Sequence, residues 1–296
     1  MLKIWKWDKY YNLPEIQEIR DKIIDTYTNK LVFVEGPHKY YLDGVEYISV
    51  SEVTHKYKPI DGEQMAENCV NKWMKDQDPS YKYYGMSKEE ILAQWKVKSD
   101  HACEFGTNVH AFGESMFYYM TGEPDKILDE CKEQFDEDGP HPANPQEKAI
   151  VKFWDDLPES FVPVLAETKV FNRNGTQYAG TFDILFYYVE EPESPKNGLL
   201  IFDYKTNEDL YKNYRGQTLL WPFQDMLDQN ASYYQLQLSC YQIPLENLGY
   251  KVIGRRLIWV RPDGSYEKIR LDSVSGRLRE ALNIPTSKEI IEKGIL

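Results

Sequence analysis

Three strand-like segments follow one another from residue 161, and they restrict the chain to a fold with a central sheet. Residues 161–171, 178–189 and 198–206 are rich in β-branched and aromatic side chains, which strands favour. The third segment contains the run LLIF without polar alternation, as expected for a central strand buried on both faces. Residues 190–198 are polar with two prolines, so we predict that the second and third strands pair antiparallel over a surface loop.

Helical patterns precede and follow these strands. Helices are predicted from apolar spacing and capping signals over residues 14–28, 106–121, 145–157 and 232–249. The second should stop at Gly122, because glycine tolerates the left-handed backbone that ends many helices. Asn144 should cap the third, and Pro244 should kink or break the fourth before it ends at Gly249.

Turn signals place further strands on either side of this pattern. Asp43-Gly44 predicts a hairpin, and Ser49 with Glu52 predicts a capping box for a short helix. Residues 255–271 predict a strand, a Pro-Asp-Gly turn and a return strand, whereas residues 60–100 are rich in tyrosine and tryptophan without a clear element. The order of helix, three strands, helix and strand predicts an α/β (α+β) fold with an N-terminal helix and hairpin extension.

Composition indicates a globular protein. At 296 residues, with 42% hydrophobic and 28% charged residues, the chain is long enough for a substantial core and has no disordered character. No apolar run reaches the length of a membrane span, and the N-terminus lacks the order of a signal peptide, so we expect a soluble, cytoplasmic protein without a membrane partner. The four cysteines show no CxxC pair, which favours reduced, mostly buried thiols over a zinc or disulfide framework.

The charge is unevenly distributed along the chain. A net charge of −13 is unfavourable for a protein that binds phosphates through a basic surface. Residues 121–160 hold twelve acidic residues against four lysines, whereas residues 251–280 hold eight basic residues against four acidic ones. Both stretches are typical of solvated faces, and the basic stretch is also a candidate DNA-facing surface.

Two predicted strands carry acidic residues that suggest a cation site. Asp203 and Lys205 are two residues apart, so their side chains should emerge on the same face of a strand. Asp183 lies in the predicted partner strand between apolar residues, where a carboxylate is costly unless it is compensated. A bound cation would compensate both acids. The alternatives are a plain Asp203–Lys205 ion pair, and an Asp183 that caps a turn or pairs with an arginine.

A histidine and a glutamate share one face of the second predicted helix. His110 and Glu114 are four residues apart, so an imidazole and a carboxylate are presented together. Each is a potential metal ligand, although a single helical histidine is more often packed or exposed.

The order of these signals resembles the RecB-like branch of the PD-(D/E)XK nuclease superfamily, which includes phage exonucleases. The residues that carry the resemblance are GTNVHAFGE with His110, AGTFD with Asp183, IFDYKT with Asp203 and Lys205, and the Gln237–Tyr241 segment QLSCY. The resemblance covers residues 100–262, and the hairpin HKYYLDGVEYISVSEV is similar to an N-terminal segment of phage-type members. It implies a restriction-endonuclease-like core, with a central mixed sheet flanked by helices. A single nuclease domain over 1–296 would comprise an extension (1–100), a catalytic core (101–262) and a C-terminal strand and tail (263–296).

The same resemblance implies the roles of individual residues. His110, Asp183, Asp203 and the Tyr204 carbonyl would hold one or two Mg²⁺ or Mn²⁺ ions, and Lys205 would orient or deprotonate the attacking water. Glu114 and Glu167 would support the first ion or bind a second, with an exposed charge as the alternative for each. Gln237 and Tyr241 would contact DNA, with a buried polar pair as the alternative.

The resemblance also implies partners, and the sequence departs from part of the family pattern. Some relatives hold an iron-sulfur cluster through clustered cysteines, but Cys240 stands alone here, so no cluster is expected. No GxxxxGK[ST] motif is present, so a helicase or recombination partner would be another chain, and a homo-oligomer is also open. We expect the chain to be a metal-dependent deoxyribonuclease, and more specifically an exonuclease. The alternatives are a silent DNA-binding or scaffolding subunit, or a nuclease acting on RNA or branched DNA.

Overall fold

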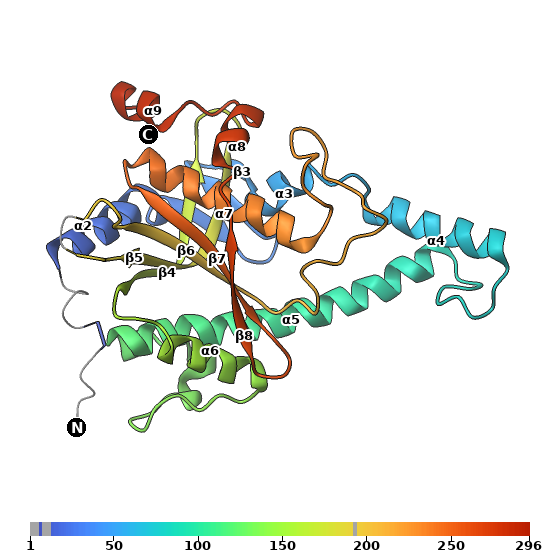
Figure 1. Cartoon of the computed structure of the whole chain (residues 1–296), viewed down its shortest axis with the longest axis horizontal. Coiled ribbons are helices and arrows are strands. Elements are labelled where there is room, and N and C mark those ends of the chain that lie inside the picture. The colour runs from blue at the N-terminus through green and yellow to red at the C-terminus, as the bar shows by residue number, and fades with distance from the viewer. Residues whose placement is uncertain (1–5, 8–12, 192–193) are drawn as a thin grey trace.

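A mixed β-sheet flanked by helices forms the body of the molecule (Figure 1), in a computed structural model that describes residues 6–7, 13–191 and 194–296. The strands are β1 (Leu31–Val34), β2 (Lys39–Leu42), β3 (Val45–Ser49), β4 (Phe161–Asn172), β5 (Tyr178–Tyr188), β6 (Gly198–Lys205), β7 (Val252–Val260) and β8 (Tyr266–Leu271). Their order is β1-β2-β3-β5-β6-β7-β8, and β4 pairs with β5 off this path. The predicted α/β class with a central mixed sheet is confirmed.

The pairing agrees with the strand predictions from the sequence. β5 pairs antiparallel with both β4 and β6, and β6 pairs in parallel with β7, which makes β6 a central strand. Every residue of β6 except Lys205 is buried, as its unbroken apolar run predicted. The hairpin β2–β3, the Ser49 capping box and the return strand β8 also form as predicted.

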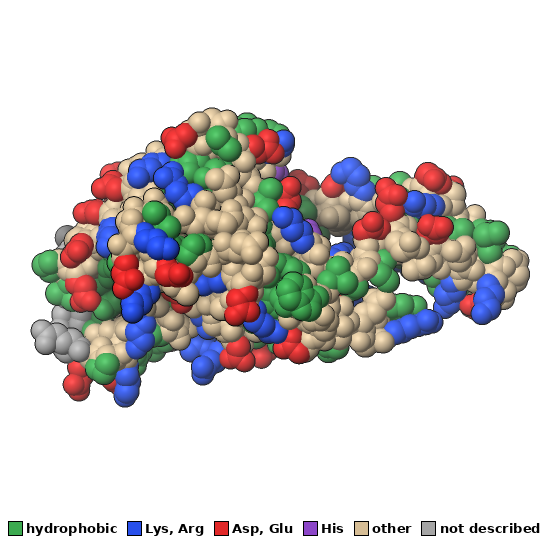
Figure 2. All heavy atoms as spheres, turned by 90° about the horizontal axis from the view of Figure 1, so that it is seen from above, with side chains coloured by type: hydrophobic (Ala, Val, Ile, Leu, Met, Phe, Trp, Pro, Cys, Tyr) green, Lys and Arg blue, Asp and Glu red, His purple; other side chains and the backbone are tan. Residues whose placement is uncertain are grey.

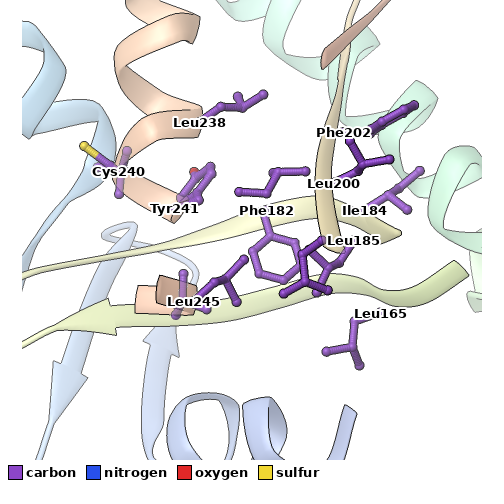
Figure 3. Close-up of a cluster of buried hydrophobic side chains, with 14 of the residues drawn as sticks. Leu165, Phe182, Ile184, Leu185, Leu200, Phe202, Leu238, Cys240, Tyr241 and Leu245 are labelled. Atoms are coloured by element: carbon purple, nitrogen blue, oxygen red, sulfur yellow. The ribbon is translucent and has the colours of Figure 1, made fainter. Parts of the chain in front are cut away.

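Helices cover both faces of the sheet. They are α2 (Pro14–Ile23), which continues as a π-helical turn (Ile24–Thr28), α3 (Val50–His55), α4 (Gly62–Asp76), α5 (Lys88–Thr121), α6 (Pro145–Asp155), α7 (Asn230–Asn247), α8 (Ser275–Ala281) and α9 (Ser287–Lys293), with 3₁₀ turns at Pro124–Lys126 and Asp129–Gln134. α5 and α6 lie below the sheet in Figure 1, and α7 lies above it with α8 and α9. Figure 3 shows part of the core, where Tyr241 of α7 meets Phe182 of β5.

Helix α5 is much longer than the sequence indicated. The predicted helix over 106–121 is the C-terminal half of a 34-residue helix that starts after a capping box made by Ser87 and Glu90. Its N-terminal half projects from the body together with α4 (Figure 1), and we call α4, residues 77–87 and this half of α5 the arm. Few residues of the arm are buried, Ala66 in α4 and Ile91 in α5 among them, and the aromatic-rich sequence over 60–100 was not assigned to helices.

Pro244 does not break α7, which runs through this residue to Asn247. Proline cannot donate to the carbonyl four residues earlier, which belongs to Cys240. The hydroxyl of the buried Tyr178 donates to that carbonyl at 2.9 Å instead. A side chain from β5 therefore replaces the missing helical bond, and the helix can continue.

Two other expectations need correction. Cys131 and Cys240 are buried, but Cys103 is exposed and Cys69 is half-buried, so the thiols are not mostly buried. In the basic stretch 251–280, Arg255 is buried and donates to Gln242 in the interior, so it does not face DNA in this structure. Among the described helices, none combines the length and apolar character needed to cross a membrane.

Candidate metal centre

The candidate site lies where β5 and β6 stop pairing. The ladder between them ends at Ile184 and Phe202, and the next residues along it are Asp183 and Asp203. At this point the backbone amide of Tyr204 donates to Oδ2 of Asp183 at 2.7 Å. The side chain of Asp183 thus replaces a contact between strands and is held where the two strands separate.

Helix α5 brings His110 to this point. The imidazole Nδ1 lies 3.2 Å from Oδ2 of Asp183. The close approach depends on Gly113, because a Cβ at this position would lie 2.5 Å from the ring of Tyr204. That ring is fixed from the other side, since the indole of Trp154 donates to the Tyr204 hydroxyl at 2.9 Å. A small residue one turn from His110 therefore sets the distance between helix and sheet.

Strand β4 contributes Glu167 in an unusual backbone conformation. Glu167 lies across from Asp183, between the pairs Ala166–Ile184 and Thr168–Phe182, and its φ is +40°. The left-handed region is costly for a residue with a Cβ, and such strain concentrates at functional sites. Potential ligand atoms of His110, Glu167 and Asp183 all lie within 4.8 Å of one another. Helix α5 and the two consecutive strands β4 and β5 thus form one possible ligand group.

Asp203 and Lys205 extend this group along β6. They form an ion pair, and the Asp203 side chain is almost completely buried. Its Oδ1 has no hydrogen-bond partner among the described residues, although an unpaired buried carboxylate oxygen is unfavourable. The ammonium of Lys205 also lies 4.7 Å from the ring centroid of Tyr234 on α7. Asp203 and Lys205 therefore lie on one face of β6, as their spacing predicted, and they also form the ion pair that was the alternative to a cation site.

The carboxyl groups of the site affect one another's protonation. Burial, followed by the charge of Asp183, raises the pKa of Asp203 to about 6. Burial also raises the pKa of Glu167 well above its usual value, again with Asp183 as the next cause. Burial alone would raise the pKa of Asp183 as well, but the adjacent His110 outweighs it and lowers that pKa.

Burial acts on the pKa values of the basic groups in the opposite direction, but the neighbouring carboxylates outweigh it. Burial would lower the pKa of Lys205, but Asp203 and Asp183 raise it above the usual lysine value. Burial would likewise lower the pKa of His110, and Asp183 raises it overall. The neighbouring carboxylates therefore favour the charged form of Lys205, and its role towards the attacking water stays a prediction.

The site as a whole has more negative than positive charge. Its acidic members are Glu114, Glu167, Asp183 and Asp203. Lys205 is the one permanent cation that the described residues bring to these acids, and His110 adds a positive charge only when it is protonated. Oxygen ligands with one imidazole nitrogen suit a divalent cation such as Mg²⁺ or Mn²⁺. The excess of acid, together with the unpaired Oδ1 of Asp203, fits a bound cation.

The remaining predicted residues lie around this group. Glu114 accepts a hydrogen bond from Tyr118 at 3.1 Å and, although it influences Glu167, lies outside the compact ligand group. Tyr204 contacts the site through its amide, and a metal-binding role for its carbonyl stays a prediction.

Gln237 and Tyr241 form a polar pair on α7. The side-chain amide of Gln237 donates to the Tyr241 hydroxyl at 3.1 Å. Tyr241 is buried against Phe182, and a Cβ at Gly180 would lie 2.8 Å from its ring. Tyr241 therefore lies in the core and does not present its ring to a ligand in this structure, whereas Gln237 is half-buried.

Sequence reasoning missed one residue and underrated another. Tyr234 lies one helical turn before Gln237, so the same helix-face argument would have found it. Glu167 was expected to support the first ion or to bind a second, and it belongs to the compact ligand group, whereas Asp203 lies outside that group. The position of the Glu167 carboxylate depends on a left-handed backbone conformation that no sequence pattern indicates.

Compared with models of known protein families and with curated proteins, the chain matches none of them.

Proposed function

We propose that the chain is a divalent-metal-dependent nuclease that hydrolyses phosphodiester bonds in DNA. The observation that carries the proposal is the group of His110, Glu167 and Asp183, whose ligand atoms lie within 4.8 Å, beside the buried Asp203–Lys205 pair. Acidic residues from adjacent strands with a neighbouring lysine are suited to phosphoryl chemistry, because they can hold cations and still present one positive charge to a phosphate. The resemblance in motif order to RecB-like nucleases supports the same conclusion.

The chemistry assigns distinct tasks to these residues. A divalent cation in this site would supply Lewis acidity and lower the pKa of a bound water. His110, Glu167 and Asp183 would hold it, and Asp203 would contribute its unpaired Oδ1. Lys205, paired with Asp203, would donate to a phosphate oxygen and would orient or deprotonate the attacking water.

Incubation of the purified protein with end-labelled linear, circular and single-stranded DNA, and with RNA, tests the proposal. Each substrate is incubated with Mg²⁺, Mn²⁺ or chelator. We expect DNA cleavage with the metals and none with chelator, and an exonuclease would leave circular DNA intact. Cleavage that persists in chelator, or cleavage of RNA alone, would contradict the proposal. If the protein binds DNA and leaves every substrate intact, it is a silent DNA-binding subunit.

A further inference from the structure

An aromatic path leads from Lys205 towards the surface. The ammonium of Lys205 lies 4.7 Å from the ring centroid of Tyr234, whose hydroxyl donates to Oδ1 of Asn207 at 2.6 Å. The backbone carbonyl of Asn207 accepts a bond of 2.8 Å from the indole of Trp259 on β7. These contacts connect Lys205 of the candidate metal centre to the side chain of Trp259 through Tyr234 and Asn207.

The path ends on an exposed tyrosine. The ring of Tyr211 lies 6.3 Å from that of Trp259, nearly perpendicular to it, and the Arg261 guanidinium lies 4.3 Å from the Trp259 ring centroid. Tyr211 is 50% exposed, although the preceding Leu210 is fully buried and its carbonyl accepts a bond from Ala231. The exposed ring is therefore carried on an anchored segment. We call Tyr211, Tyr234 and Trp259 the stacking strip.

The loop between β6 and α7, residues 206–229, exposes further apolar side chains. Tyr214 and Trp221 are 61% and 72% exposed, yet the loop is held in place by the buried Leu219 and Phe223. The space-filling view (Figure 2) shows apolar side chains at the surface where the arm leaves the body, with lysine and arginine side chains beside them. Aromatic groups exposed on a fixed loop beside a candidate active site indicate a binding surface.

The charge of the chain favours stacking over phosphate contacts. A net charge of −13 opposes binding through a basic surface, and the 206–229 loop itself carries more acidic than basic residues. Stacking of bases on aromatic rings contributes affinity without a basic surface, and it requires bases that are not paired in a duplex. Lys205 and Arg261 lie against rings of the strip, but each is already paired with a carboxylate, Asp203 and Glu267 respectively.

We propose that the stacking strip binds the unpaired bases of a single strand and directs that strand into the candidate metal centre. The inference rests on the proposed nuclease function and adds a substrate class to it, namely single-stranded nucleic acid with exposed bases. The rings would stack with successive bases irrespective of their sequence, because every base has an aromatic face.

Binding experiments in chelator test the strip without depending on cleavage. Fluorescence anisotropy is measured with labelled oligothymidylate, with an abasic oligomer of the same length, with oligouridylate and with duplex DNA. The wild type should bind oligothymidylate more tightly than the abasic oligomer or the duplex. Tyr211→Ala should weaken oligothymidylate binding about tenfold, the effect of about 1.4 kcal/mol of stacking, and should leave abasic binding unchanged.

Two further variants keep the test interpretable. Tyr211→Phe keeps the ring and should restore tight binding, whereas Tyr41→Ala, on β2 at the opposite edge of the sheet, should behave like the wild type. Equal affinity for the abasic oligomer and oligothymidylate, tighter binding of duplex, or absence of nucleic-acid binding would each overturn the inference. Tight oligouridylate binding supports stacking of unpaired bases and extends it to RNA. Cleavage by the wild type is scored separately, so the proposed nuclease function can fail while the strip still binds.

Discussion

Among the single residues of the site, Glu167 stands out because its backbone is left-handed. Such a conformation costs about 1–3 kcal/mol and persists where the surrounding structure determines it. Here it accompanies a carboxylate held close to those of Asp183 and Asp203, each of which raises its pKa. A bound cation would relieve this repulsion, so the strain and the metal are consistent with one another.

Glu167→Gln should therefore lower the affinity for Mn²⁺ at least about tenfold, because it removes a charged ligand from the compact group. Glu114→Gln is the matched control. It changes a carboxylate that influences Glu167 but lies outside that group, and its effect should be smaller. Isothermal titration with Mn²⁺ measures both. Equal losses in the two variants would remove Glu167 from the set of ligands.

His110 should determine the preference between ions. Mn²⁺ accepts an imidazole nitrogen more readily than Mg²⁺, so the wild type should cut DNA with Mn²⁺ at least as fast as with Mg²⁺. His110→Asp supplies an oxygen instead and should shift residual activity towards Mg²⁺, whereas His110→Ala should lose activity with both ions. Cleavage rates with each ion provide the comparison. An active His110→Ala with the wild-type ratio of rates would place His110 outside the site.

At the level of elements, the closeness of α5 to β6 sets the geometry of the site. Gly113→Ala would place a methyl group 2.5 Å from the Tyr204 ring, so we expect a loss of about 1–3 kcal/mol in the free energy of unfolding. Gly106→Ala, in the same helix, meets only Thr206 Oγ1 at 3.6 Å and should leave stability unchanged or raise it by up to about 1 kcal/mol. Urea denaturation followed by circular dichroism separates the two. Similar effects in both variants would mean that the contact with Tyr204 is unimportant.

The continuity of α7 through Pro244 depends on Tyr178. Tyr178→Phe should cost about 1–3 kcal/mol, because the buried Cys240 carbonyl loses its donor. In a Pro244→Ala background the new backbone amide can bond that carbonyl, so the same substitution should cost less. Thermal or urea unfolding of the four proteins completes a double-mutant cycle. An equal cost in both backgrounds would show that Tyr178 does not compensate for the proline.

The helices and strands also show which parts of the fold local sequence signals can predict. Strands β4 to β8, the Ser49 capping box and the end of α5 at Gly122 follow from local signals, and all are observed. Asp183, Asp203 and Lys205 could be grouped from spacing and strand pairing, whereas His110 joined them only through the resemblance in motif order. The uninterrupted α7 and the arm could not be predicted, because one depends on a distant tyrosine and the other buries few side chains. The position of Glu167 likewise depends on a backbone angle that tertiary contacts determine.

For the whole molecule, the proposed binding of DNA by an acidic chain with an acid-rich site would need affinity from sources other than a general basic surface. The buried Arg255 shows that part of the apparent basic excess stabilises the fold instead. Affinity would then come from the bound cation and from stacking along the strip, and both act near the site. The cation is then essential for cleavage, whereas the strip binds the strand without it.

The most direct test is the rate at which end-labelled linear DNA is cut as Mn²⁺ is titrated, for the wild type and for Asp183→Asn prepared in parallel. Asp183 contacts His110 and receives the Tyr204 amide, so its loss should reduce the rate about a hundredfold or more at every Mn²⁺ concentration. The account predicts a rate that rises and saturates with Mn²⁺ in the wild type alone. Equal cutting by both proteins, or a wild type that binds Mn²⁺ and leaves DNA intact, would contradict it.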